Sequence, residues 1–328
     1  MKTSMEVKVE RFPIAGRFII ARGSKTEAVV VTVTLDKDGH HGHGECVPYA
    51  RYGETVESVV AAIEGARALI ESGEGREALQ RAMKAGAARN AVDSAMWDLE
   101  AKLSGHRAHE LAGVSKLAPV TTAYTISLGT PEEMAEAVRK VADRPVLKIK
   151  LGAPDGDFAR IKAVREAAPK ASFIADANEG WTEENLVAHL EACAEAKFSL
   201  IEQPLPSTRD EALRGVKRLV PLCADESVHD RASLDRLVGL YDVVNIKLDK
   251  TGGLTEALEM AKAAEAKGFG LMIGCMVGTS LAMAPALTLA PKARFVDLDG
   301  PLLLARDRDH GLRYEGSVVH PPESDLWG

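Results

Sequence analysis

Hydrophobic positions follow different patterns in the two parts of the chain. Up to about residue 50 the pattern is typical of β-strands, and the β-branched run at 27–35 leads into the turn sequence Asp36-Lys37-Asp38-Gly39. Between residues 54 and 112 the period becomes helical, and Gly105 supplies a stop signal for one helix. The positions expected on the buried face of that helix are Val92, Ala95, Met96, Leu99 and Leu103. The first third of the chain is therefore predicted to be a small α+β region.

After this region, short apolar runs alternate with helical stretches. Polar positions 150, 176, 202, 225, 247, 275 and 297 within them are 22 to 28 residues apart, the length of one strand, one helix and two loops. The eight runs are Pro119–Ser127, Val146–Leu151, Ser172–Ala177, Ser199–Gln203, Val220–Asp225, Val243–Leu248, Gly270–Cys275 and Arg294–Asp299. This alternation predicts an α/β barrel of parallel strands. An open, doubly wound sheet is the alternative, although no glycine-rich loop for a dinucleotide or phosphate follows any run.

Two helices of this second region carry boundary signals of their own. The sequence Thr130-Pro131-Glu132-Glu133 has the composition of a capping box with proline at the first helical position. Gly268 is expected to end the helix that runs from about Leu254 to Lys267.

Composition excludes several classes of protein. The 328 residues carry a formal net charge of −7 without a basic stripe, so neither nucleic acid nor a membrane surface is an expected partner. No apolar run approaches the roughly 20 residues that span a bilayer, and the first residues lack an apolar signal core, so a cytoplasmic protein is expected. Four well-separated cysteines predict neither a zinc cluster nor a disulfide framework. His40, His41 and His43 follow the Asp-Gly turn and are expected at a solvated hairpin tip rather than at a metal ion.

Alternate residues of a strand share one face, and this orients the polar residues of the eight runs. In the run at 147–151 the three aliphatic residues must face the helices, so Lys148 and Lys150 face the barrel interior. One such polar residue is commonly a solvated loop residue, but carboxylates and lysines on consecutive strands together indicate an active site at the carboxyl ends of the strands. The further residues expected there are Asp176, Asn178, Glu202, Asp225, Asn245, Lys247, Asp297 and Asp299.

The residue types suggest a reaction. Asp176, Glu202 and Asp225 supply three oxygen ligands with neither His nor Cys, which suits Mg²⁺, or Mn²⁺ in its place, rather than Zn²⁺. Such an ion can bind a substrate carboxylate and stabilise the charge that develops when an adjacent C–H loses its proton. A lysine base needs a lowered pKa near neutral pH, and neighbouring lysines and the ion are expected to lower it. Lys150 and Lys247, on opposite sides of the barrel, would remove and return a proton and so invert a stereocentre.

Five motifs resemble those of the enolase superfamily, in its muconate-lactonizing-enzyme-like subgroup. They are Lys148-Ile149-Lys150, Ala175-Asp176-Ala177-Asn178, Ile201-Glu202-Gln203-Pro204, Ala224-Asp225-Glu226-Ser227 and Asn245-Ile246-Lys247. The resemblance covers nearly the whole chain and implies an α/β fold, a modified TIM barrel of the (β/α)₇β type with an N-terminal α+β capping domain. The implied boundaries are 1–117 for the cap, 118–304 for the barrel and 305–328 for a C-terminal segment that returns to the cap.

The resemblance also implies roles for individual residues. It implies one Mg²⁺ on Asp176, Glu202 and Asp225, with Lys148 at the substrate carboxylate and Lys150 and Lys247 as the acid/base pair. Within that pair, Lys150 would serve the (R)-epimer and Lys247 the (S)-epimer.

A narrower resemblance concerns the last strand. The sequence Asp297-Leu298-Asp299 is similar to the Asp-x-Asp motif of dipeptide epimerases, in which two carboxylates receive the α-ammonium group of the substrate. The segment 18–24 resembles the mobile capping loop of L-Ala-D/L-Glu epimerases, and Arg22, or alternatively Lys25, would pair with the glutamate side chain. Two further barrel-mouth positions match substrate contacts of that family, Thr125 and Cys275.

These features predict an isomerase, a Mg²⁺-dependent epimerase of L-Ala-D-Glu and L-Ala-L-Glu. It would transfer a proton at the glutamate α-carbon between two bases through a metal-stabilised enolate, and would act in the degradation of cell-wall (murein) peptides. A small dipeptide is the expected partner, and the chain could form a homo-oligomer. One alternative is another superfamily reaction, o-succinylbenzoate synthesis or cycloisomerisation, which leaves Asp297 and Asp299 unexplained. The other is a non-catalytic, metal-stabilised binding barrel.

Overall fold

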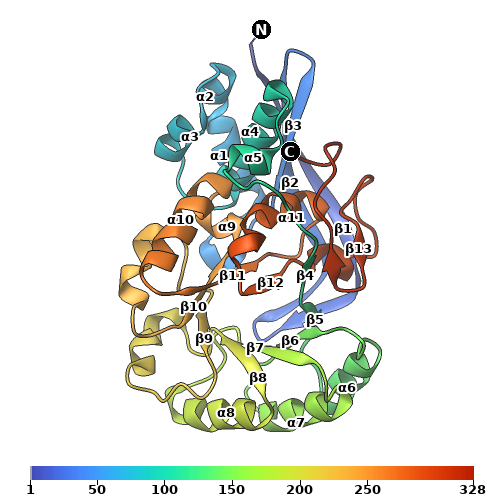
Figure 1. Cartoon of the computed structure of the whole chain (residues 1–328), viewed down its shortest axis with the longest axis vertical. Coiled ribbons are helices and arrows are strands. Elements are labelled where there is room, and N and C mark those ends of the chain that lie inside the picture. Colours follow the sequence, from blue (N-terminus) through green and yellow to red (C-terminus); the bar gives the residue numbers. More distant parts are fainter. Residues whose placement is uncertain (1) are drawn as a thin grey trace.

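The computed structural model describes residues 2–328 and arranges them in a cap and a barrel (Figure 1). The cap sheet is antiparallel and consists of β1 (Ser4–Ile20), β2 (Gly23–Lys37) and β3 (His40–Cys46). The barrel strands pair in parallel, each with its neighbour in the chain. They are β5 (Tyr124–Ile126), β6 (Val146–Lys150), β7 (Ser172–Asp176), β8 (Phe198–Glu202), β9 (Leu222–Ala224), β10 (Val243–Ile246), β11 (Gly270–Gly274) and β12 (Phe295–Asp297). The barrel prediction is confirmed.

The predicted first barrel run is split between two sheets. Its beginning, β4 (Val120–Thr121), pairs with β14 (Val318–Val319) of the C-terminal hairpin, whose other strand is β13 (Tyr314–Glu315). At Ala123 the chain enters the barrel, and its amide donates to the Val296 carbonyl at 2.8 Å, which joins the last strand to the first. The expectation of one continuous barrel strand from residue 119 to 127 was therefore wrong. β4 pairs with β14 in a separate sheet, and only β5 belongs to the barrel.

Helices cover the outside of the barrel unevenly. The α-helices that follow barrel strands are α6 (Pro131–Arg139), α7 (Asp157–Ala167), α8 (Glu183–Glu195), α9 (Leu248–Thr251), α10 (Leu254–Ala266) and α11 (Ser280–Ala286). The capping box at Thr130 is confirmed, since its hydroxyl accepts from the Glu133 amide at 3.2 Å, and α10 ends just before Gly268 as predicted.

Helical stretches were wrongly predicted after β8 and β9. Short 3₁₀ turns take their place, at Ser207–Leu213, Arg231–Ser233 and Asp235–Leu237. These two units are among the shortest in the chain, 23 and 22 residues between equivalent positions. Pro204, Pro206 and the left-handed Gly215 further limit the first of them, because proline removes a backbone donor and fixes φ.

The cap contains a helical layer packed on its sheet. Its helices are α1 (Val56–Gly65), α2 (Arg67–Glu71), α3 (Arg76–Ala82), α4 (Ala87–Ser104) and α5 (Ala108–Leu111). The predicted α4 face is buried except at Leu103, which is 40% exposed because it lies beyond the part of the helix that packs in the cap core. The Asp38-Gly39 turn has positive φ at both residues, as a tight hairpin requires. His40 and His41 are exposed beyond it, as expected, whereas His43 is half-buried within β3.

Helix α4 approaches β3 closely because β3 has glycine at two positions. A Cβ atom on Gly44 would lie 2.0 Å from the carbonyl oxygen of Ala91, and one on Gly42 would lie 2.3 Å from that of Ala95. No side chain fits in these spaces. The contact therefore depends on glycine for close approach, although neither residue has a positive φ.

The barrel interior has two layers of opposite character. Its floor is apolar and consists of Ala123, Ile174, Leu200, Cys223, Val243 and Met272. Two residues further along five of these strands, on the same face, lie polar residues: Thr125, Asp176, Glu202, Asp225 and Asn245. The predicted inward orientation of the lysines is confirmed, because Lys148 contacts carboxylates from three strands.

Buried polar contacts join the cap to the barrel. Glu45 of β3 accepts from the Thr279 amide at 2.8 Å and from the Arg308 guanidinium at 2.7 Å. Asp249 of α9 accepts from the Val47 amide at 3.1 Å and from the Asn90 side chain at 2.9 Å. The C-terminal segment also reaches the cap, where the amide of residue 328 donates to a carboxylate of α4 (Figure 1). In the described part of the chain, no helix has both the length and the apolar character needed to cross a bilayer.

Replacing Gly44 with alanine is expected to destabilise the cap. The added methyl group would force α4 away from β3, and overpacking of this kind costs about 1–3 kcal/mol. Urea unfolding followed by circular dichroism measures the loss. The matched control is Gly65→Ala at the end of α1, where nothing lies within 4 Å of a new Cβ, and it should leave stability unchanged or slightly higher. Equal effects of the two substitutions would contradict the close packing.

Asp249 should make stability depend on pH. Burial, only partly offset by hydrogen bonds from Asn90 and Val47, raises the pKa of Asp249 to about 7. Between about pH 4 and pH 7 the folded protein keeps a proton on Asp249 that the unfolded chain has released. The contribution of Asp249 to the free energy of unfolding is therefore highest below pH 4 and falls as the pH rises toward 7. Asp249→Asn should therefore gain about 2–4 kcal/mol relative to wild type between pH 4 and pH 8, measured by urea unfolding. A pH-independent difference between the two proteins would contradict this assignment.

Candidate active site

A cavity of about 450 Å³ lies between the carboxyl ends of the barrel strands and two segments of the cap. Residues 18–25, at the tip of the β1–β2 hairpin, and residues 47–52 after β3 form its roof. Ten barrel residues were predicted to hold the metal, act as acid or base, or contact the substrate, and eight of them line the cavity: Thr125, Lys148, Lys150, Asp225, Lys247, Cys275, Asp297 and Asp299. The other two, Asp176 and Glu202, are fully buried directly beneath. The fold thus brings all ten into one region.

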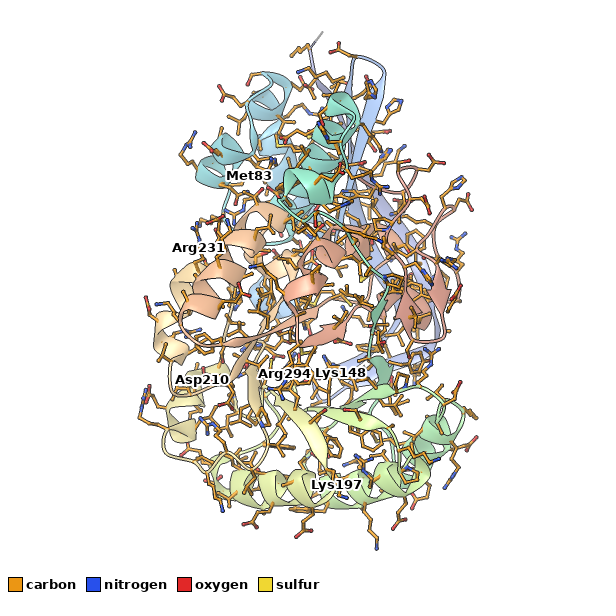
Figure 2. All side chains as sticks on the ribbon, in the orientation of Figure 1. Met83, Lys148, Lys197, Asp210, Arg231 and Arg294 are labelled. Carbon is orange, nitrogen blue, oxygen red and sulfur yellow. The ribbon has the colours of Figure 1, made fainter. Side chains whose placement is uncertain are left out.

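Lys148 is at the centre of a buried network of charges. Its ammonium group lies 2.7 Å from Glu202, 2.8 Å from Asp297 and 3.0 Å from Asp176. Figure 2 shows Lys148 among the barrel strands, below the cap. Three carboxylates from three strands therefore share one cation, and the register that sets Asp176 opposite Glu202 on β7 and β8 helps to bring them together.

Lys150 and Lys247 lie on two sides of this network, and each forms an ion pair with one aspartate. The Lys150 ammonium lies 2.6 Å from Oδ2 of Asp176, its register partner on β7. The Lys247 ammonium lies 2.7 Å from Oδ2 of Asp225, at the end of β9. Each of these lysines borders the cavity and pairs with a different carboxylate of the predicted metal triad.

The expectation of lowered lysine pKa values is wrong for Lys148 and Lys247 when only the protein's own groups act on them. Burial lowers the pKa of Lys148, but Asp176, Asp297 and Glu202 outweigh it and raise the pKa well above its usual value. The pKa of Lys247 is likewise raised, because Asp225 outweighs burial and the neighbouring Lys148. Repulsion between lysines is the smaller effect, since carboxylates surround each of them at shorter range.

The donor set fits a hard divalent cation. Burial, with the nearby charge of Asp176, raises the pKa of Glu202 to about 8, so this carboxyl ionises poorly unless further positive charge is supplied. As the side chains stand, no three or more His, Cys, Asp or Glu groups in residues 2–328 converge on one point that could hold a metal ion. The Lys148 ammonium group lies between the carboxylates of Asp176 and Glu202 instead, and Lys247 pairs with Asp225. An oxygen-only set of three carboxylates is the kind that Mg²⁺ prefers.

Two carboxyl groups border the cavity at the last strand. Oδ2 of Asp299 accepts from the Thr125 amide at 2.6 Å, and burial followed by the charge of Asp297 raises the pKa of Asp299 to about 7. Oδ1 of Asp297 is buried without a hydrogen-bond donor among the described residues. Because a buried acceptor without a donor is costly, this oxygen is suited to receive one from a ligand. Cys275 borders the same part of the cavity as a neutral thiol, since burial raises its pKa well above the usual value.

The strands that carry Asp176 and Glu202 end in unusual backbone conformations. Asn178 and Glu179 have φ values of 45° and 67°, and Gln203 has a φ of 36°. Non-glycine residues in this left-handed region cost about 1–3 kcal/mol each and persist where surrounding contacts enforce them. The Gln203 side chain supplies such contacts, because its Oε1 accepts from the Asp225 amide at 2.9 Å and its Nε2 donates to the Tyr241 hydroxyl at 2.9 Å.

The roof is fastened to the barrel by ion pairs that the sequence did not reveal. Arg22 donates to Glu226 and to the Asn178 carbonyl, both at 2.6 Å. Arg51 pairs with both oxygens of Glu179 at 2.8 Å. Glu226 directly follows Asp225 in one of the recognised motifs, but a motif alone does not indicate which cap residue contacts it.

Two more roof residues approach the charged network. Phe18 places its ring 5.6 Å from the Lys150 ammonium, and thereby shields one side of this lysine from solvent. The Lys25 ammonium lies 5.3 Å from the Tyr49 ring centroid and has no acidic partner in residues 2–328. Burial, which has no such partner to oppose it, lowers the pKa of Lys25.

Both parts of the chain match known protein families. Residues 2–113 match the N-terminal domain of the mandelate racemase / muconate lactonizing enzyme family, and residues 133–324 match the enolase C-terminal domain-like family. The chain belongs to this family of enolase-like proteins. The predicted superfamily and the modified barrel with its cap are thereby confirmed.

Particular relatives narrow the class. The chain is 45% identical to the L-Ala-D/L-Glu epimerase of Escherichia coli (strain K12), over 97% of this chain and 99% of that one. It is 46% identical to an N-acetyl-D-glutamate racemase of a Pseudoalteromonas species, over 92% and 95%. Both relatives are isomerases, and the prediction of an isomerase is confirmed.

A solved structure is also very similar. An enolase family member from Agrobacterium tumefaciens with homology to dipeptide epimerases, crystallised with sodium and L-Ala-L-Glu, superposes with a TM-score of 0.98. It shares 54% identity, with 99% of this chain and 100% of that chain covered. A dipeptide epimerase of Enterococcus faecalis V583, in complex with Mg and L-Leu-L-Tyr, has a TM-score of 0.91 at 30% identity, with 98% of each chain covered.

Proposed function

We propose that this protein is a Mg²⁺-dependent epimerase of dipeptides that end in glutamate, with L-Ala-D-Glu and L-Ala-L-Glu as its substrates. The observation that carries the proposal is the arrangement of Lys150 and Lys247, each at the cavity and each paired with its own carboxylate, together with the Asp297–Asp299 pair. Two bases at one cavity suit removal and return of a proton at the same carbon. The identity of the relatives supports the same reaction.

The residues divide the work of binding among them. Asp297, with its unpartnered Oδ1, and Asp299 would accept the α-ammonium group of the dipeptide. Asp176, Glu202 and Asp225 would hold Mg²⁺, which when bound neutralises negative charge on the substrate carboxylate as the α-proton leaves. Lys148 would contribute a second positive charge near that carboxylate.

The proton moves between the two lysines and the α-carbon. Lys150 would take the proton from the (R)-epimer and Lys247 from the (S)-epimer, and the opposite lysine would return it from the other face. Phe18 covers one side of Lys150 and limits the access of water during proton transfer, whereas between turnovers the ammonium group exchanges its protons with solvent through the cavity.

Lys25 is a better candidate than Arg22 for binding the glutamate side chain of the substrate. Arg22 already donates to Glu226 and to the Asn178 carbonyl, so its guanidinium is engaged within the protein. Lys25 borders the same cavity and has no acidic partner of its own in residues 2–328. Pairing with a substrate carboxylate would therefore give Lys25 a counter-ion without breaking an existing ion pair. Specificity for dipeptides that end in glutamate would suit a role in the degradation of cell-wall peptides.

Proton NMR in D₂O tests the reaction directly. L-Ala-L-Glu is incubated with protein and Mg²⁺, and N-acetyl-L-glutamate is run in parallel because one relative acts on the N-acetyl compound. Loss of the glutamate α-proton signal and growth of the other diastereomer are expected for the dipeptide. Faster exchange of N-acetylglutamate would refute the ammonium role of Asp297 and Asp299, and no exchange in either substrate would refute the proposal.

Removing each lysine should produce opposite directional defects. Lys150→Ala should slow α-proton exchange from L-Ala-D-Glu by at least 10²-fold more than exchange from L-Ala-L-Glu, and Lys247→Ala should do the reverse. Deuterium incorporation from each epimer measures both rates, with Lys140→Ala on the exposed surface as the control. Equal, mild defects in both directions would rule out two bases.

Lys25→Met should change specificity more than catalysis. Loss of the ammonium group is expected to raise KM for L-Ala-L-Glu about 10–100-fold, with kcat within a few-fold of wild type, because one charged contact to the substrate costs on the order of 1.5–3 kcal/mol. The KM for L-Ala-L-Leu should stay the same. Arg17→Met, on an exposed part of β1, is the matched control. An unchanged KM for the glutamate dipeptide would exclude Lys25 from the subsite.

A further inference from the structure

A fourth lysine lies beneath the site and takes no part in the reaction proposed above. Lys250 belongs to α9, and its side chain is 1% exposed and does not border the cavity. Its ammonium group lies 2.5 Å from Oδ1 of Asp225, 2.6 Å from the Asp225 carbonyl and 3.0 Å from the Asn245 carbonyl. All three acceptors belong to the ends of β9 and β10, so Lys250 fastens these strand ends together.

The two lysines on Asp225 differ in how firmly they are held. Lys247 makes one hydrogen bond, to Oδ2, and borders the cavity. Lys250 makes three, two of them to backbone carbonyls that cannot turn away. Lys247 can therefore leave its oxygen by a side-chain rotation, whereas Lys250 keeps Oδ1 engaged. The oxygen that becomes available to a cation is Oδ2.

We propose that Lys250 is a positioning residue that holds Asp225 with Oδ2 directed toward the metal ion. This inference rests on the proposed Mg²⁺ site. A carboxylate ligand binds a metal tightly when a hydrogen bond to its other oxygen fixes its orientation, and loss of such a partner typically weakens binding 10–100-fold. The Asp225 amide, held by Gln203, fixes the backbone, and Lys250 fixes the side chain.

Titration calorimetry of Mg²⁺ into the full-length protein without dipeptide tests the inference. Lys250→Met, which keeps an unbranched apolar stem and removes the ammonium group, should weaken Mg²⁺ binding about 10–100-fold. The matched control is Lys262→Met on the neighbouring α10, where the lysine is exposed and pairs with Glu259, and its Mg²⁺ affinity should equal that of wild type.

A second measurement separates positioning from proton transfer. At saturating Mg²⁺, Lys250→Met should slow α-proton exchange from both epimers by the same factor, unlike Lys247→Ala. Mg²⁺ affinity within twofold of wild type would overturn the inference, and so would a defect in one direction only, which is the behaviour of a base. If Lys250→Met does not fold by circular dichroism, Lys250→Gln replaces it: the two N–H bonds of its amide cannot satisfy all three acceptors, so Mg²⁺ binding should still weaken, and wild-type affinity would overturn the inference.

The result can be told apart from a failure of the proposed function. If wild-type protein binds Mg²⁺ but exchanges no dipeptide proton, the substrate assignment fails while the calorimetric comparison still decides the role of Lys250. If wild-type protein does not bind Mg²⁺, the metal site fails and the role of Lys250 fails with it.

Discussion

Many charged groups are buried in a single layer of the barrel, and the pairing that this burial requires determines how the strands, the cap and the site fit together. Five carboxylates and four lysines meet there: Asp176, Glu202, Asp225, Asp297 and Asp299 with Lys148, Lys150, Lys247 and Lys250. An isolated charge in such a place is too costly to keep, so each must have a partner of opposite sign. With all five carboxyl groups ionised, the four lysines would leave an excess of one negative charge, and burial with the neighbouring acids opposes that excess by raising the pKa of Glu202 and Asp299. A bound divalent cation would relieve that excess.

The period of the β-strand explains how a short stretch of sequence builds this layer. In a barrel, residues two apart face inward at successive heights, so an apolar floor and a charged layer follow from single steps such as Ile174 to Asp176 and Leu200 to Glu202. In-register parallel pairing then sets Lys150 beside Asp176 and Asp176 beside Glu202. The apolar floor closes the site from below, which leaves the cap as its boundary on the other side.

This logic also explains which parts of the structure the sequence could predict. Lys148, Lys150 and Asp176 were predictable because strand parity is local, and the family motifs supplied the ligand set. The Arg22–Glu226 and Arg51–Glu179 pairs were not predictable, since 204 and 128 residues separate the partners and only the docked cap brings them together. The short turn after β8 was missed because the apolar residues of this segment resemble those of a helix, and its proline and glycine residues were not taken into account. Lysine pKa values were misjudged because the sequence gives the lysines on one strand but not the distances to carboxylates on others.

The barrel and the cap contact different parts of the proposed substrate, and this gives a physical reason why relatives are named for different substrates. The barrel layer contains the proposed acid/base pair and the buried carboxylates, and changing it would disturb every buried charge at once. The roof residues lie at the tip of the β1–β2 hairpin and in the segment after β3, where substitution costs less than in the buried layer. Two relatives named hydrophobic dipeptide epimerases, at 35% and 33% identity, differ in the kind of side chain that their name implies, and in our proposal the substrate side chain meets Lys25 in the roof. An N-acetyl-D-glutamate racemase at 46% identity differs at the amino group instead, which in our proposal meets Asp297 and Asp299 at the edge of the layer. Specificity for the side chain can therefore change in the cap alone, whereas specificity for the amino group must change where Asp297 pairs with Lys148.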